Sequence, residues 1–180
     1  MAKVSIVYFS GSGRTALVAS HVLKGLHTVA GIEAELITVD EAKANLGLLD
    51  AADTIVFGTP TMMGNVAAPF KAFMDATGGI WFQQGWKDKM AAGFTNSLGL
   101  SGDKLNTLQT LSVFAAQHSM IWISQGVISN SEQNRLSSWL GLMAQTDQGA
   151  ESPATVDLTT AELFGARIGA ATVRWVAGKA

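Results

Sequence analysis

Cysteine is absent from this chain of 180 residues. Its absence excludes disulfides, thiolate metal sites, iron–sulfur clusters and a cysteine nucleophile, and it fits a reducing compartment. Charged residues are also scarce, at 14%, and the formal net charge is -2 without any block of like charge. Binding to nucleic acid or to an anionic membrane surface is therefore not expected, because both need clustered Lys and Arg.

Long hydrophobic runs are missing too. No apolar stretch approaches the roughly 20 residues that a membrane-spanning helix needs, and the opening residues 1–9 predict a first strand rather than a signal peptide. We therefore expect a cytoplasmic protein without membrane insertion, folded as one domain over residues 1–180. The hydrophobic content of 48% fits a buried parallel sheet, and it also fits additional subunit contacts.

Hydrophobic periodicity predicts strands that alternate with helices. The expected strands are residues 4–9, 33–39, 54–57, 89–95 and 120–124. The expected helices are residues 15–29, 67–76, 104–117 and 159–177, the last of them opened by a capping box of Thr159 and Glu162. Residues 40–50 predict one helical turn at most, and residues 126–153 give no assignment. This alternation indicates an α/β fold with a parallel sheet and helices on both faces.

The loop after the first strand has the composition of a phosphate site. Ligands in open parallel sheets bind beyond the carboxyl ends of the strands, and a helix N-terminus offers free amides and a partial positive charge. The P-loop pattern is absent. Gly11, Gly13 and Ala16 formally satisfy the dinucleotide pattern, with Asp40 where a ribose-binding acid would stand, whereas the hydroxyl-rich composition favours a mononucleotide. A plain Ser/Gly turn is the third interpretation.

A second motif follows the third strand. It is Gly-Thr-Pro-Thr-Met-Met-Gly-Asn at residues 58–65, and Phe-Met-Asp-Ala-Thr-Gly-Gly-Ile-Trp follows at residues 73–81. These blocks resemble the WrbA-type NAD(P)H:quinone oxidoreductases, within the flavodoxin-like NADPH-dependent FMN reductase superfamily. The resemblance runs from residue 1 to about residue 126. It implies a flavodoxin-like three-layer fold whose five-stranded parallel sheet has the order 2-1-3-4-5.

The resemblance also implies FMN as cofactor, NAD(P)H as electron donor and no metal. It assigns the FMN phosphate to Ser10, Gly11, Ser12, Gly13, Arg14 and Thr15. It assigns the flavin ring to Pro60, Thr61, Met62, Met63, Gly64 and Asn65, and to Asn96, Ser97, Leu98, Gly99, Leu100, Ser101 and Gly102. Soft apolar contact from the methionines suits a flat ring. His118 matches a flavin-proximal histidine, and Trp81 matches an aromatic near the substrate. The alternative for His118 is a helix-capping or core histidine. The alternative for Trp81 and Trp86 is a place in the core or in a subunit interface.

The implied activity is hydride transfer from NAD(P)H through FMN to a quinone-like acceptor, in a homodimer or homotetramer. Three alternatives stay open: a one-electron carrier of the flavodoxin type, a Rossmann dehydrogenase that uses NAD, and a flavin-binding regulatory module. Residues 130–153 do not match the corresponding loop of the family. Ser12 and Arg14 also replace the tyrosine and histidine that the family usually has in its phosphate loop, so substrate choice is expected to differ.

Overall fold

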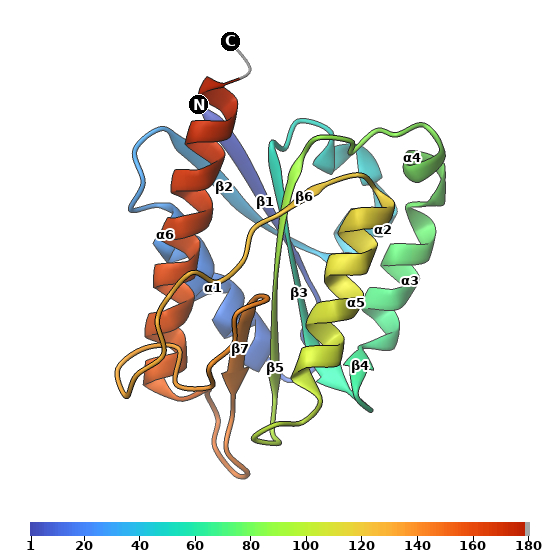
Figure 1. Cartoon of the computed structure of the whole chain (residues 1–180). Helices are drawn as coiled ribbons and strands as arrows, with labels where there is room; N and C mark the ends of the chain where they lie inside the picture. Colours follow the sequence, from blue (N-terminus) through green and yellow to red (C-terminus); the bar gives the residue numbers. More distant parts are fainter. Residues whose placement is uncertain (179–180) are drawn as a thin grey trace.

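The computed structural model describes residues 1–178 as a central sheet covered by helices on each face (Figure 1). The strands are β1 (Ala2–Tyr8), β2 (Ile32–Thr38), β3 (Thr54–Met62), β4 (Asn65–Val66), β5 (Met90–Ser97), β6 (Ile121–Trp122) and β7 (Leu142–Gln145). The helices are α1 (Arg14–Leu26), α2 (Val39–Ala44), α3 (Ala68–Ala76), α4 (Gly78–Phe82), α5 (Lys104–Gln117) and α6 (Thr155–Ala177), with a short 3-10 helix η1 (Leu46–Leu49).

The main strands are parallel and follow the order β2-β1-β3-β5-β6. This confirms the predicted order 2-1-3-4-5, since β4 is only a short antiparallel addition to β3. The Rossmann order 3-2-1-4-5-6 is a different one. Strand β1 has β2 on one side and β3 on the other. The chain therefore reverses its direction of winding beside β1, and a ligand crevice is expected at the carboxyl ends of β1 and β3.

The fifth strand position is divided between two segments. β6 pairs with the start of β5 through Met90↔Ile121 and Ala91↔Trp122. β7 pairs with the end of β5, from Phe94↔Leu142 to Ser97↔Gln145. The prediction of one strand at residues 120–124 was therefore wrong in extent, because the chain leaves the sheet after residue 123, whose N–H still donates to the Ala91 carbonyl, and returns at residue 142 to complete it. The segment without assignment supplies the half of the strand nearest the crevice.

Two hydrophobic clusters fill the two interfaces between the sheet and the helices. α1 and α6 cover one face, where Val22 and Phe164 pack on sheet residues such as Ile6. α2, α3 and α5 cover the other face, where the aromatic side chains gather. Trp86 is fully buried there, tilted against Phe57 and Phe73. Trp86 is thus a core residue, which decides between the two interpretations left open for it.

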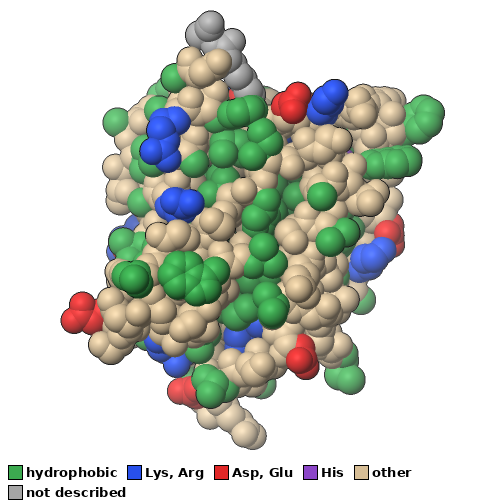
Figure 2. Space-filling view, in the orientation of Figure 1, with side chains coloured by type: hydrophobic (Ala, Val, Ile, Leu, Met, Phe, Trp, Pro, Cys, Tyr) green, Lys and Arg blue, Asp and Glu red, His purple; other side chains and the backbone are tan. Residues whose placement is uncertain are grey.

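The edge of the sheet beside β6 and β7 carries no helix in front of it. Figure 2 shows hydrophobic side chains along this edge, between the α6 side and the α5 side of the molecule. Trp139 and Ile128, on the segment that interrupts the fifth strand, are more than half exposed. The insertion therefore adds apolar surface to one edge of the molecule.

Helix boundaries differ from the predictions where side chains found other partners. α6 begins at Thr155, so Thr159 and Glu162 lie inside the helix and the predicted capping box does not form. Glu162 instead accepts hydrogen bonds from Lys24 and the ring of His21 on α1, at 2.9 and 2.8 Å. α3 ends at Ala76, and α4 begins at Gly78 with only Thr77 between the two helices. Within residues 1–178, no helix combines the length and apolar character that crossing a bilayer requires.

Candidate functional site

An open cleft of about 580 Å³ lies at the carboxyl ends of β1, β3 and β5. Three loops that are far apart in the sequence form it: the loop after β1, the β3–β4 hairpin and the loop after β5. Its lining residues are Phe9, Gly11, Ser12, Arg14, Thr15, Pro60, Thr61, Met62, Met63, Gly64, Asn96, Ser97, Leu98, Gly99 and Gly102. All of them except Phe9 belong to the residues that the sequence assigned to cofactor binding. A mostly apolar slot with a few polar groups is typical of a cofactor site.

The loop after β1 leaves free amides at the start of α1. Gly13 is the N-cap residue with φ +82°, and no side chain caps the helix. The Leu17 N–H donates to the Gly13 carbonyl, and the Ala16 N–H donates to Ser10 Oγ at 3.1 Å. The N–H groups of Arg14 and Thr15 come before those of Ala16 and Leu17 in the chain, at the end of the helix where the dipole is positive. Ser10 and Gly13 thus determine the conformation of the loop, although neither of them lines the cleft.

Arg14 joins the loop after β1 to a distant segment. Its Nη2 atom donates to the Ala150 carbonyl at 2.7 Å. Ala150 belongs to the connection between β7 and α6, so the guanidinium holds that connection beside the start of α1. Arg14 also lines the cleft. It supplies the only cationic side chain among the lining residues, which suits an anionic group at this end of the cleft.

The β3–β4 hairpin forms the mouth of the cleft. Met62 pairs with Asn65, and the two residues between them have left-handed backbone, with φ +47° at Met63 and +79° at Gly64. Two consecutive residues of this kind form the tight hairpin turn that matches the twist of the strands. The Met63 side chain is fully exposed and that of Met62 is 57% exposed. Asn65 Oδ1 accepts a hydrogen bond from the N–H of the next residue, Val66. The Asn65 side chain therefore stabilises the hairpin and does not line the cleft.

Buried hydroxyl groups support the floor of the cleft. Thr61 Oγ1 lies 2.8 Å from both Thr95 Oγ1 and Thr107 Oγ1, which joins β3, β5 and α5. Asn96 is buried, and its Oδ1 accepts a hydrogen bond from Thr146 Oγ1 at 3.1 Å. These buried hydroxyl and amide oxygens bond to one another, and such networks hold the surrounding backbone in one arrangement.

The loop after β5 is organised by Lys104, a residue that sequence reasoning missed. Lys104 is buried, and its Nζ donates to Ser97 Oγ at 3.0 Å, to the Gly99 carbonyl at 2.7 Å and to the Leu100 carbonyl at 2.9 Å. Burial lowers the pKa of the ammonium, an effect opposed by the nearby Asp157 carboxylate. Leu100 and Ser101 do not line the cleft and instead line a neighbouring surface groove. The sequence feature that could have identified Lys104 is a lysine in the first helical turn after a glycine-containing loop.

His118 and Trp81 lie at the other end of the molecule. α5 starts beside the cleft and runs back for 14 residues, about 21 Å, before it ends at His118. There His118 Nε2 lies 2.9 Å from Thr77 Oγ1, and its buried ring packs 4.5 Å from that of Trp86. Trp81 and His118 share a small hollow of about 160 Å³. Neither residue lines the cleft of its own chain, so their catalytic assignment stays a prediction that requires the cleft of a second copy.

Burial lowers the pKa of His118 below its usual value of 6.5. The unfolded chain therefore binds a proton at this residue more readily than the folded chain does. We expect the free energy of unfolding to fall as the pH decreases from 7.5 to 5.5, by at most about 1.4 kcal/mol per pH unit. Urea unfolding at several pH values measures this slope. The slope should be smaller in the His118→Gln variant. An equal slope in both proteins would show that His118 is not the source of this pH dependence.

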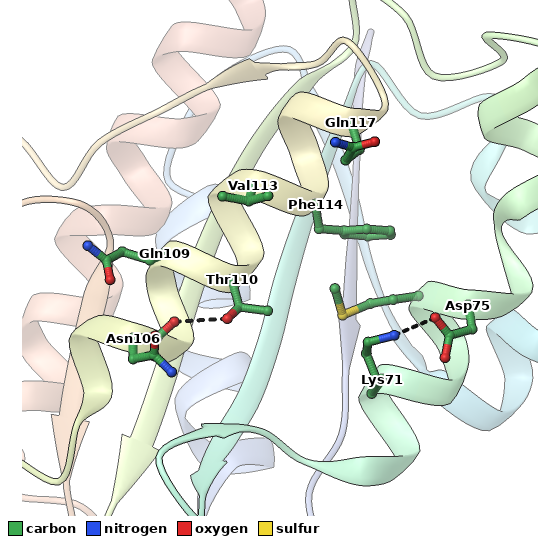
Figure 3. A pocket seen from close by; sticks show the side chains of 9 residues that line it. Lys71, Asp75, Asn106, Gln109, Thr110, Val113, Phe114 and Gln117 are labelled. Atoms are coloured by element: carbon green, nitrogen blue, oxygen red, sulfur yellow. Dashed lines mark hydrogen bonds and ion pairs between the residues drawn. The ribbon is translucent and has the colours of Figure 1, made fainter.

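A second hollow, of about 430 Å³, lies between α3 and α5 on the face of the aromatic core (Figure 3). Lys71 and Asp75 form an ion pair on one side of it. Asn106, Thr110 and Val113 face it from α5 (Figure 3). Lys71 and Asp75 neutralise each other, and Phe114 and Met74 form the floor of the hollow. None of its lining residues belongs to the three loops of the cleft, although Asn106 donates to the Gly64 carbonyl of the β3–β4 hairpin at 2.7 Å.

Comparison with known proteins identifies relatives that cover more than nine tenths of the chain. The family model described as NADPH-dependent FMN reductase matches residues 40–135. The flavodoxin FldP of Pseudomonas aeruginosa is 38% identical, over 93% of this chain and 95% of its own length. An NAD(P)H dehydrogenase (quinone) of Trichlorobacter lovleyi is 28% identical, over 98% of this chain and 100% of its own length.

Solved structures agree with these relatives. The crystal structure of a WrbA-like flavodoxin from Agrobacterium tumefaciens has a TM-score of 0.79 and 38% sequence identity, covering 97% of this chain and 99% of that one. An archaeal flavodoxin has a TM-score of 0.70 at 19% identity, covering 95% and 99% of the two chains, which supports the fold alone. The flavodoxin-like fold predicted from the sequence is confirmed.

Proposed function

Because this chain belongs to the family of NADPH-dependent FMN reductases, we propose that it passes hydride from NAD(P)H through FMN to a quinone-like acceptor. FMN is its cofactor and NAD(P)H its electron donor. The coarse activity, an FMN-dependent oxidoreductase, follows from the family. The observation that carries the proposal is the convergence of three separate loops on one cleft at the carboxyl ends of β1, β3 and β5.

The residues at one end of the cleft suit the phosphate group of FMN. A phosphate monoester carries close to two negative charges and accepts many hydrogen bonds. The amides that open α1, the hydroxyls of Ser12 and Thr15, and the Arg14 guanidinium are the donors there. We infer that this loop holds the phosphate. Arg14 would then contact the phosphate while it keeps the Ala150 segment beside the loop.

The residues along the rest of the cleft suit a flat ring. Pro60, Met62 and Leu98 supply apolar surface, and the backbone of the loop after β5 supplies polar groups beside it. Gly102 has φ +56°, and a Cβ there would come within 2.6 Å of Ser97 Oγ. Only glycine therefore permits the close fold of this loop. We infer that the isoalloxazine ring lies between this loop and the β3–β4 hairpin.

The chemistry itself comes from the cofactor. When bound, FMN supplies a site that accepts two electrons as hydride and delivers them to a second substrate. The residues of this chain bind the phosphate, orient the ring and exclude water from one of its faces. Homodimer or homotetramer formation stays a prediction, and it is the arrangement that would bring His118 and Trp81 to the cleft of another copy.

Anaerobic addition of NADH or NADPH to the FMN-loaded protein tests the proposal. We expect the flavin absorbance to bleach on mixing, and a soluble benzoquinone to restore it. Because the two substrates use the same flavin in turn, steady-state kinetics should be ping-pong. A protein that binds FMN tightly and is bleached by neither nucleotide would refute the proposed activity.

A one-electron carrier is the second candidate, because a relative with 38% identity is named a flavodoxin. Stepwise reduction with dithionite separates the two functions. A carrier should accumulate a stable one-electron-reduced flavin and resist reduction by NAD(P)H. The formal net charge of -2 gives no sign of the strongly acidic docking face that suits such carriers.

A further inference from the structure

Lys104 occupies a position that costs stability. It is the first residue of α5, where the helix dipole disfavours a cation, and its side chain is 1% exposed. Burying an ammonium is unfavourable unless it is paired and fully hydrogen-bonded. Three hydrogen bonds to Ser97, Gly99 and Leu100 compensate for part of this cost. An apolar residue of similar length would avoid the cost of the charge.

No carboxylate neutralises Lys104 directly. Among residues 1–178, no acidic oxygen lies within ion-pair distance of its Nζ. The buried Asp157 carboxylate is the opposing charge that acts on Lys104, and Arg135 already binds that carboxylate through two nitrogens, at 2.9 and 2.8 Å. Asp157 also accepts the Gln145 N–H at 2.9 Å. The three charged groups together therefore carry a net charge of about +1 below the loop after β5.

The acceptors of Lys104 place this charge next to the cleft. Ser97 and Gly99 line the cleft, and both bond directly to the Lys104 ammonium. The charge thus lies one residue layer behind the surface that faces the ring. A buried charge this close to the cleft acts strongly on a ligand whose own charge changes, because the protein interior screens it less than water does.

Reduction changes the charge of the flavin. FMN takes up two electrons and one proton from NAD(P)H as hydride, and the ring gains one negative charge when no second proton follows. We propose that Lys104 is a positioning residue that holds the loop of residues 97–101 against FMN and whose charge makes the cleft bind reduced FMN more tightly than oxidised FMN. The inference rests on FMN binding in the cleft, which is part of the proposed function.

The experiment measures the two-electron midpoint potential of bound FMN by equilibration with reference dyes, using dithionite and no nicotinamide. In Lys104→Met we expect at least a tenfold loss of preference for reduced FMN, which for a two-electron couple is a shift of about 30 mV to more negative potential. Lys104→Gln keeps N–H donors for the loop and removes the charge, so it should show the same shift. Lys104→Arg keeps the charge and should recover most of the wild-type potential.

Lys89→Met is the matched control. Lys89 also donates to two carbonyls, of Asp50 and Ala52, but it lies at the amino end of β5, away from the cleft. This variant should leave the potential unchanged. A wild-type potential in Lys104→Gln, or an equal shift in Lys89→Met, would overturn the inference.

Folding and function are kept separate in this design. If Lys104→Met fails to fold, judged by circular dichroism, Lys104→Gln carries the same test. If NAD(P)H does not reduce the wild-type protein but the potentials shift as expected, the proposed activity fails and the role of Lys104 stands. If NAD(P)H bleaches the flavin and the potentials do not shift, the proposed activity stands and the role of Lys104 fails.

Discussion

Replacing Gly13 with valine should raise the Kd for FMN at least 100-fold while the chain still folds. Gly13 adopts φ +82°, a left-handed conformation that a β-branched residue avoids. Valine would draw this residue toward negative φ and turn the first amides of α1 away from the cleft. The loss of two or more hydrogen bonds to a charged phosphate accounts for an effect of this size. Fluorescence quenching of FMN on titration measures it.

Gly31→Val is the control for Gly13→Val. Gly31 has φ +83°, and like Gly13 it has open space around the position of a Cβ. It lies in the connection between α1 and β2, at the end of β1 opposite the cleft. Both variants should lose about 1–2 kcal/mol of unfolding free energy through the backbone strain. Only Gly13→Val should lose FMN, and equal affinities in the two variants would contradict the phosphate-loop assignment.

Replacing Gly165 with alanine should lower the free energy of unfolding by about 2–3 kcal/mol. α1 and α6 touch through their backbones: a Cβ at Gly165 would lie 2.1 Å from the Val22 carbonyl oxygen, and one at Gly25 would lie 1.9 Å from that of Glu162. Backbone atoms cannot yield as a flexible side chain does. The two helices must separate, which loosens the packing of Phe164 on the sheet.

Gly79→Ala provides the comparison for Gly165→Ala. Gly79 is also helical, in α4, and nothing lies within 4 Å of the position of its Cβ. Alanine there should be neutral or should stabilise by up to about 1 kcal/mol, because it removes conformational freedom from the unfolded chain. Urea unfolding of both variants measures the difference. A Gly165→Ala protein as stable as the wild type would show that α1 and α6 do not approach so closely.

The loop after β1 was accessible from the sequence because it carries its own local pattern, whereas the resemblance to the family assigned the other two loops of the cleft to the flavin ring. Gly13 marks a left-handed turn between a strand and a helix, and Met63-Gly64 joins the end of β3 to the short strand β4. Parallel strands bring their carboxyl ends to one edge, so loops that follow them meet there. Alternating elements thus predicted an α/β fold with helices on both faces of a parallel sheet and a ligand site at its carboxyl edge, and the resemblance to the family supplied the remaining residues of the cleft.

The sequence alone determined the first four strands of the parallel sheet and most of the helices, since periodicity and turn residues are properties of neighbours along the chain. Tertiary structure decided what depends on distant partners. β7 is a strand because β5 presents unpaired backbone to it, not because its four residues have strong β-character. His118 lies far from the cleft because α5 runs antiparallel to the strands. Lys104 became part of the site only when the loop after β5 folded its carbonyls around the ammonium.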